Sequence, residues 1–220
     1  MHTRSEDPGS LKAKVAVFAF QTFMRRGIRT VKMDDIAAAF SMSKRTLYEL
    51  FDDKEDLLVA GLALFMKDVS ENYERVRNES DNLLQAYLKW HFIYIKKVRY
   101  VSHAFLSDVS QYHKVRQYYE SEQQRRDAAK REFLQQGVTE GLFRTDINYE
   151  LFQLIVDLAE EKTSFMELHK QYSYDDFFRS VLLVQLRGIC TEKGLQVLND
   201  NLDRMNEKEV TSSLSPRKKI

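Results

Sequence analysis

The stretch that decides the fold is TVKMDDIAAAFSMSKRTLYELFDDKEDLL, residues 30–58. Its first part carries apolar side chains at helical spacing, at Met33, Ile36, Ala37 and Phe40. After a break at residues 41–43, Ser43 is a favourable N-cap for a second helix, in which Leu47 and Phe51 point inward. Two short helices joined by a three-residue turn are typical of a helix-turn-helix.

The segments around this motif also predict helices. Residues 11–26 repeat apolar side chains at helical spacing, and Gly27 fits the position just past a helix end. Downstream, Asp53 can cap a helix, with Asp56 three residues on in an acidic version of the capping box. The remaining expected helices are 54–77, 81–98, 101–112, 114–137, 148–169 and 174–200. The sequence therefore predicts an all-α protein with a small helical module at its N-terminus.

The predicted N-terminal module is basic. Residues 11–50 hold eight basic and three acidic side chains, an excess of five positive charges in a chain of net charge +1. A local basic excess favours phosphate binding, although a solvated helix face has the same composition. With Leu47 and Phe51 inward, the second arm of the motif exposes Lys44, Arg45, Thr46, Tyr48 and Glu49. Hydrogen-bond donors in that position suit base edges and phosphates in the major groove of DNA.

Three blocks, residues 30–37, 43–48 and 51–58, resemble the DNA-binding signature of the TetR family in order and spacing. The resemblance covers about residues 15–58. It implies that the helix 44–51 enters the major groove. The side chains it implies at bases or nearby phosphates are Ser43, Lys44, Arg45 and Thr46, and those at phosphates are Tyr48 and Lys54.

The chain departs from the family pattern at two positions. Ser41 stands in the turn where glycine is common, so the backbone there must either avoid positive φ or tolerate its cost. Lys32 stands where Thr or Ser commonly precedes the first helix of the motif, and lysine cannot accept hydrogen bonds from the helix N-terminus. Lys32 either reaches a DNA phosphate or is an ordinary solvated lysine.

The resemblance also implies how the chain is divided. A DNA-binding domain is expected at residues 11–56 and a helical effector-binding and dimerisation domain at 57–205. Flexible ends are expected at 1–10 and 206–220.

The predicted helix 81–98 is apolar around most of its circumference, which is typical of a helix inside a domain. It nevertheless carries polar-tipped rings that need partners when buried, at Tyr87, Trp90, His91 and Tyr94. Because TetR-like regulators hold effectors in a cavity of this domain, these residues are the effector-site candidates, with His103 and Phe105 nearby in the sequence. A packed aromatic core is the alternative.

The resemblance places a homodimer interface on the helices 148–169 and 174–200, as a four-helix bundle with two helices from each subunit. The candidate contact residues are Phe177, Val181, Val184 and Gly188. A glycine inside a helix is unfavourable by about 1 kcal/mol relative to alanine, so Gly188 indicates a close helix approach. A single buried core would produce the same pattern.

Common enzyme and metal-site motifs are absent from the sequence. The five histidines are scattered without metal-ligand spacing, and there is no glycine-rich phosphate loop or GxSxG motif. We therefore expect no catalysis, no metal and no cofactor. No apolar run is long enough to span a bilayer, and the single cysteine, Cys190, fits a reducing cytoplasm, so we expect a cytoplasmic protein without a membrane partner.

These observations favour a sequence-specific DNA-binding transcriptional regulator. The expected partners are double-stranded DNA with a near-palindromic operator and a second copy of the chain. The resemblance to the TetR family further implies a small-molecule effector that releases a repressor from DNA. A helical protein-interaction adaptor is the alternative, but it does not account for the patterned basic module.

Overall fold

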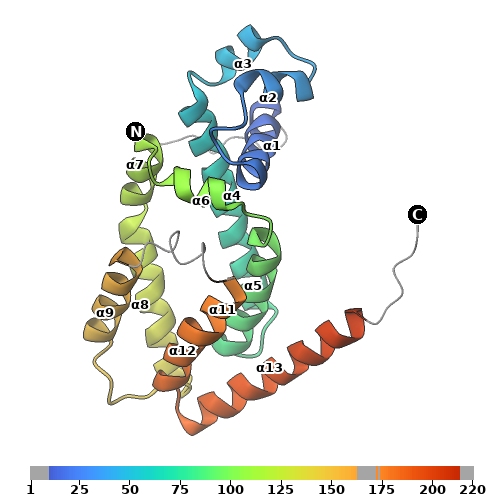
Figure 1. Cartoon of the computed structure of the whole chain (residues 1–220). Coiled ribbons are helices and arrows are strands. Elements are labelled where there is room, and N and C mark those ends of the chain that lie inside the picture. Colours follow the sequence, from blue (N-terminus) through green and yellow to red (C-terminus); the bar gives the residue numbers. More distant parts are fainter. Residues whose placement is uncertain (1–9, 163–171, 173, 214–220) are drawn as a thin grey trace. The chain divides into compact units, whose positions relative to one another are not determined.

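The computed structural model describes residues 10–162, 172 and 174–213. Every regular element in this part of the chain is a helix, which confirms the predicted all-α fold (Figure 1). The helices are α1 Leu11–Arg26, α2 Met33–Ala39, α3 Lys44–Leu50, α4 Lys54–Asn78, α5 Leu83–Val98, α6 His103–Val109, α7 His113–Ser121, α8 Gln123–Thr139, α9 Tyr149–Lys162, α11 Tyr174–Phe177, the π-helical turn η1 Phe178–Leu182, α12 Leu183–Ile189 and α13 Glu192–Ser213.

The predicted helices of the N-terminal module lie within one residue of the observed bounds. Further along, the single predicted helix 114–137 is wrong, because it is broken at Glu122 into α7 and α8. Glu122 adopts φ −92° and ψ −2°, which ends α7, and its carbonyl then accepts the amide of Arg126 in α8. Of the predicted helix 148–169, residues 163–169 lie outside the described residues.

The predicted helix 174–200 is also wrong as a single element. It contains η1 and then breaks at Cys190, whose backbone is extended. The amide of Thr191 donates to the carbonyl of Leu142 at 2.9 Å, and the amide of Arg144 donates to the carbonyl of Ile189 at 2.9 Å. This pairing with a distant loop replaces helical hydrogen bonds. After the break, α13 continues to Ser213, into the segment predicted to be a flexible tail.

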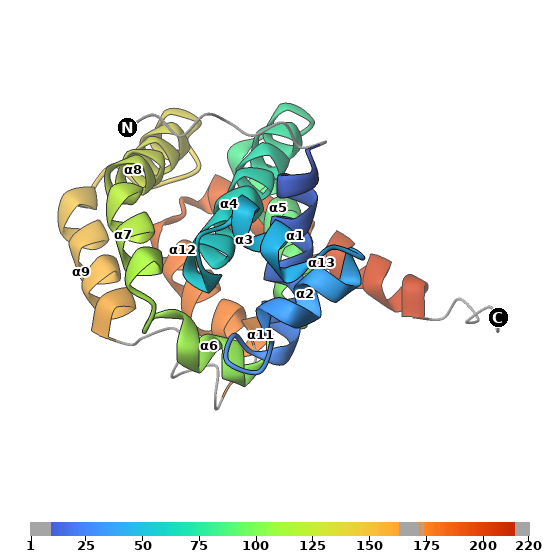
Figure 2. The same ribbon diagram turned by 90° about the horizontal axis from the view of Figure 1, so that it is seen from above.

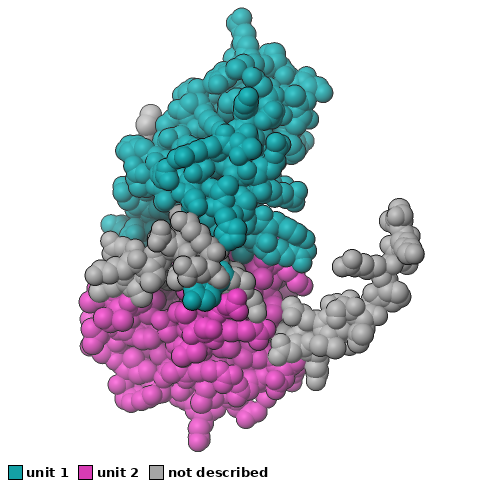
Figure 3. Space-filling view, viewed as in Figure 1, with its two compact units in different colours: residues 1–71, 97–127, 159–173 teal, residues 72–96, 128–158, 174–220 magenta. Residues whose placement is uncertain are grey.

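The chain divides into two compact units, which Figure 3 colours separately. Unit 1 comprises residues 1–71, 97–127 and 159–173, and unit 2 comprises residues 72–96, 128–158 and 174–220. Unit 1 therefore holds α6 and α7 together with the predicted DNA-binding segment. The domain boundaries at 11–56 and 57–205 stay a prediction.

One hydrophobic core joins α6 to the helix-turn-helix within unit 1. The ribbon of α6 lies beside that of α1 (Figure 2). The rings of Phe20 in α1 and Phe105 in α6 pack edge to face, with centroids 5.7 Å apart. The amide of Ser102, just before α6, donates to the carbonyl of Met24 at 2.6 Å. The end of α1 lies close to α6 as well, because a Cβ on Gly27 would lie 2.7 Å from that of Ala104. The position and orientation of α1 thus depend on α6.

A close helix crossing fixes α1 on α4. A Cβ atom at Gly61 would lie 2.5 Å from the Cβ of Phe20 and 2.6 Å from the carbonyl oxygen of Ala16. Real side chains do not approach so closely, so only glycine allows this packing. The first part of α4 is therefore seated directly against α1.

The core of unit 2 is formed around α5. Leu83, Leu84 and Leu88 are fully buried and pack with Leu142 and Phe143 from the loop after α8. The remaining buried members of this core are Leu134, Phe178, Leu183, Leu186, Ile189, Cys190 and Leu198.

In the part of the chain that the structure describes, no helix combines the length and the apolar character needed to cross a bilayer.

Candidate DNA-binding surface

The helix α3 is fixed by its two inward side chains, as the sequence predicts. Leu47 is fully buried, and Phe51 is 3% exposed in the core of unit 1. The hydroxyl of Ser43 accepts the amide of Thr46 at 3.0 Å, so Ser43 is the predicted N-cap. The hydroxyls of Ser43 and Thr46 also lie 2.9 Å apart and share a hydrogen bond. The start of α3 is thus well ordered by local bonds.

The outer face of α3 is polar and open to solvent. Lys44 and Arg45 are exposed, and 42% of Tyr48 is exposed. Lys44 forms a 3.0 Å ion pair with Asp34, and the hydrogen bond between them raises the pKa of the Lys44 ammonium group. Because exposed ion pairs contribute little to stability, breaking this pair would destabilise the protein little.

Arg45 has a similar arrangement within its own helix. Its guanidinium group lies 3.1 Å from the carboxylate of Glu49, four residues on, and 89% of its side chain is exposed. The fork of a guanidinium group matches the two acceptors of guanine in the major groove. The contact of Arg45 with a base stays a prediction.

The N-terminus of α2, the first helix of the motif, is capped without a hydroxyl at residue 32. The backbone amide of Lys32 donates to the carboxylate of Asp35 at 2.9 Å, whereas the side chain of Lys32 is exposed. The turn tolerates positive φ, since Ser41 adopts φ +52°. A backbone hydrogen bond stabilises the turn, in which the amide of Met42 donates to the carbonyl of Ala37 at 3.0 Å.

Lys54 differs from the other candidates because its ammonium group is turned toward the core. The ammonium nitrogen lies 5.6 Å from the ring centroid of Phe23, and the residue is half-buried. Partial burial lowers the pKa of Lys54 below its ordinary value. Its phosphate contact stays a prediction.

The effector-site candidates are distributed over both units. Tyr87, Trp90, His91 and Tyr94 form a continuous aromatic group on α5 in unit 2. Trp90 stacks on Tyr94 with centroids 5.5 Å apart, and buried His91 stacks on Phe178 at 3.6 Å.

The other two candidates, His103 and Phe105, belong to α6 in unit 1. His103 is exposed at the start of the helix, and Phe105 packs on Phe20 in the core. The packing thus assigns Phe105 a role in supporting α1.

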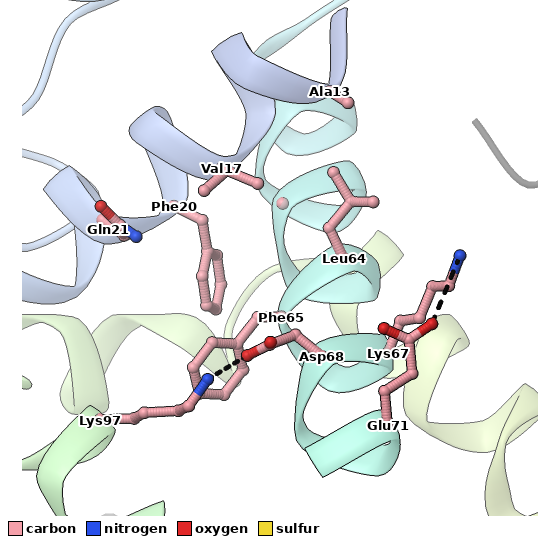
Figure 4. A pocket seen from close by; sticks show the side chains of 11 residues that line it. Ala13, Val17, Phe20, Gln21, Leu64, Phe65, Lys67, Asp68, Glu71 and Lys97 are labelled. Carbon is pink, nitrogen blue, oxygen red and sulfur yellow. Dashed lines mark hydrogen bonds and ion pairs between the residues drawn. The ribbon is translucent and has the colours of Figure 1, made fainter. Parts of the chain in front are cut away.

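A pocket of about 460 Å³ opens between α1 and α4 in unit 1 (Figure 4). Phe20, Phe65 and Leu64 contribute apolar surface to it. Its charged side chains pair with one another, Lys97 with Asp68 and Lys67 with Glu71. The pocket therefore offers a ligand little uncompensated charge.

Some of the dimer candidates lie at the surface of unit 2. Val181 is 37% exposed and Val184 is 59% exposed, whereas Phe177 is half-buried. Nothing among the described residues would lie within 4 Å of a Cβ at Gly188, so this glycine does not reflect close packing within them.

Three exposed apolar residues of α9 were not singled out by sequence, Leu151, Leu154 and Ile155, although their spacing is helical.

The class of protein that this geometry defines is an all-α protein with a packed helix-turn-helix, whose second helix presents basic side chains to solvent. Residues 18–60 match the model of the family described as bacterial regulatory proteins, tetR family. The match covers 43 of the 220 residues, so it shows that the helix-turn-helix segment is similar to the N-terminal segment of this family. No curated protein sequence matches the chain.

Solved structures share the fold. The transcriptional regulator from Cytophaga hutchinsonii ATCC 33406 is 20% identical with a TM-score of 0.62, covering 83% of this chain and 100% of its own. The fatty acid degradation regulator FadR from Bacillus halodurans is 19% identical with a TM-score of 0.57, covering 82% and 97%. The ketosteroid transcriptional regulator KstR2 of Mycobacterium tuberculosis is 20% identical with a TM-score of 0.53, covering 84% and 97%.

Proposed function

We propose that this protein is a repressor that binds a near-palindromic operator as a homodimer and leaves it when a small molecule binds. The observation that carries the proposal is the presentation of α3, in which Leu47 is locked in the core while Lys44, Arg45 and Tyr48 face solvent. A rigid helix with outward donors is what direct readout in a major groove requires.

The operator symmetry follows from the geometry of recognition. Two α3 helices of a dimer must meet successive major grooves, about 34–36 Å apart, so the two half-sites repeat with inverted direction. Support for a dimer comes from apolar side chains left exposed on unit 2, at Leu151, Leu154, Ile155, Val181 and Val184. A second subunit would remove this surface from water.

The effector is proposed to be a small, partly apolar molecule at the aromatic group of α5. Coupling is reciprocal, so the factor by which the ligand lowers DNA affinity is also the factor by which DNA lowers ligand affinity. Trp90 is the only tryptophan in the chain, and its fluorescence reports binding directly. The substitutions His91→Ala and Tyr94→Phe are expected to weaken ligand binding while ligand-free DNA affinity stays nearly unchanged.

Selection of bound fragments from the source genome, followed by binding assays over a salt series, tests the DNA-binding part. Arg45→Ala is expected to relax the preference at one base pair of the selected site by about 1–3 kcal/mol. Arg125→Ala is the matched control, because Arg125 also lies in an exposed 3.1 Å pair with a near neighbour, Glu122. The control should keep the preference. If no sequence is enriched at moderate salt, the proposed function is wrong.

A further inference from the structure

The first turn of α4 and the two residues before it carry a high density of negative charge. Asp52, Asp53, Glu55 and Asp56 all lie within five residues. Asp53 caps the helix, because its carboxylate accepts the amide of Asp56 at 2.8 Å. Carboxylates at a helix N-terminus are favourable for the helix. They are unfavourable for DNA, since this helix end follows α3 after only three residues and like charges repel.

A single basic side chain from a distant part of the sequence forms ion pairs with these carboxylates. The ammonium nitrogen of Lys114, in α7, lies 2.7 Å from Asp53 Oδ2 and 2.6 Å from Asp56 Oδ1. The backbone amide of the same residue donates to Glu55 Oε2 at 3.1 Å. Lys114 thus contacts three of the four carboxylates, and all of these residues belong to unit 1.

The position of Lys114 is set by the core. The next residue, Val115, is 1% exposed and packs with the hydrophobic core that also contains Leu47 and Leu57. The hydrogen bonds to Asp53 and Asp56 raise the pKa of the Lys114 ammonium group, so it stays charged over the whole physiological range. A fixed, permanently charged group therefore bridges two carboxylates at the start of α4.

We propose that Lys114 is a positioning residue of the DNA-binding surface, which holds and neutralises Asp53 and Asp56 so that this end of α4 can approach a DNA phosphate. The inference rests on the proposed DNA binding and adds a residue that lies far outside the helix-turn-helix in the sequence. The ion pairs of Lys114 lie near the protein surface, where solvent screening keeps their contribution to folding stability small. The effect of Lys114 should therefore be larger on DNA affinity than on the stability of the protein.

The test compares variants of the full chain on two duplexes, one recovered by genomic selection and one of unselected sequence. Lys114→Met is expected to lower affinity for both by about three- to tenfold at low salt, and by less as salt screens the carboxylates. Lys114→Arg keeps a cation and should retain affinity. Lys130→Met is the matched control, since it removes one positive charge from a 2.6 Å pair with Asp157 in unit 2, with the same 37% side-chain exposure as Lys114.

A double-mutant cycle separates a positioning role from a simple charge effect. In an Asp53→Asn, Asp56→Asn background, asparagine still caps the helix, but Lys114 has no carboxylate to neutralise. Lys114→Met is then expected to change DNA affinity less than about twofold, as residues that act through one another are not additive. An equal loss in both backgrounds, or an equal loss for Lys130→Met, would overturn the proposal.

The outcomes also distinguish this inference from the proposed function. Wild-type protein that binds the unselected duplex but enriches no sequence refutes the sequence-specific function alone, because the variant comparison on the unselected duplex still applies. Wild-type protein that binds neither duplex refutes both. Circular dichroism of each variant checks that the helical fold is retained, and Lys114→Arg provides a second variant that does not depend on the loss of the side chain.

Discussion

Replacing Ser41 by glycine should stabilise the protein. Ser41 adopts φ +52°, in the left-handed region that is unfavourable for a non-glycine residue by about 1–2 kcal/mol. The serine is exposed, and its side chain makes no hydrogen bond to any described residue, so its removal breaks no contact. Glycine loses more conformational entropy on folding, which offsets about 0.5–1 kcal/mol of the gain. The net stabilisation should be about 0.5–1 kcal/mol.

Urea unfolding followed by circular dichroism measures this change. The midpoint should rise with an unchanged slope, and the melting temperature should rise by about 1–4 °C for a chain of this size. Ser41→Ala is the control, because it keeps a Cβ atom at positive φ and should give no comparable gain. A destabilised glycine variant, or an alanine variant stabilised to the same degree, would refute the argument from backbone strain.

Two further substitutions test packing and assembly. Gly61→Ala forces a Cβ atom against Phe20 and should destabilise the protein by about 1–3 kcal/mol in thermal unfolding, whereas Gly188→Ala, with open space around it among the described residues, should not. If Gly61→Ala is neutral, the close crossing of α1 and α4 is not as tight as described. Val184→Glu should yield monomers with poor operator binding, and Leu11→Glu, which alters an exposed apolar residue of unit 1, should leave the dimer intact. Analytical ultracentrifugation checks both variants, and an unchanged dimer for Val184→Glu would show that the interface does not include Val184.

Local signals in the sequence predicted the N-terminal module well. The N-cap at Ser43, the inward Leu47 and Phe51, and the helix end at Gly27 all depend on residues within about four positions of one another. The bounds of α1 agree with the prediction for the same reason. Such short-range rules determine a helix and its caps wherever tertiary contacts do not compete.

The misplaced helices have a tertiary cause that no local pattern contains. The break at Cys190 arises because Thr191 pairs with Leu142, about 50 residues away. A hydroxyl at Thr191 then accepts the amide of Gly194 at 3.0 Å and starts α13, a capping signal that is visible in the sequence only once the break is known. Sequence proximity also does not reveal that Phe105 packs on Phe20 in unit 1 while the other aromatic effector candidates lie on α5 in unit 2, and its part in effector binding stays a prediction.

The start of α4 shows how a sequence rule can be correct and incomplete at once. The acidic capping box around Asp53 predicts a stable helix N-terminus, and the structure confirms the cap. The same carboxylates oppose the function that the neighbouring helix α3 indicates, because a DNA-binding surface must accept phosphates. Natural sequences resolve such conflicts through long-range contacts, and here the contact is made by Lys114, about 60 residues away along the chain. The helix-turn-helix segment alone therefore lacks the cation that pairs with its acidic turn, and the comparison of Lys114→Met with Lys130→Met in the full chain shows whether DNA binding depends on that cation.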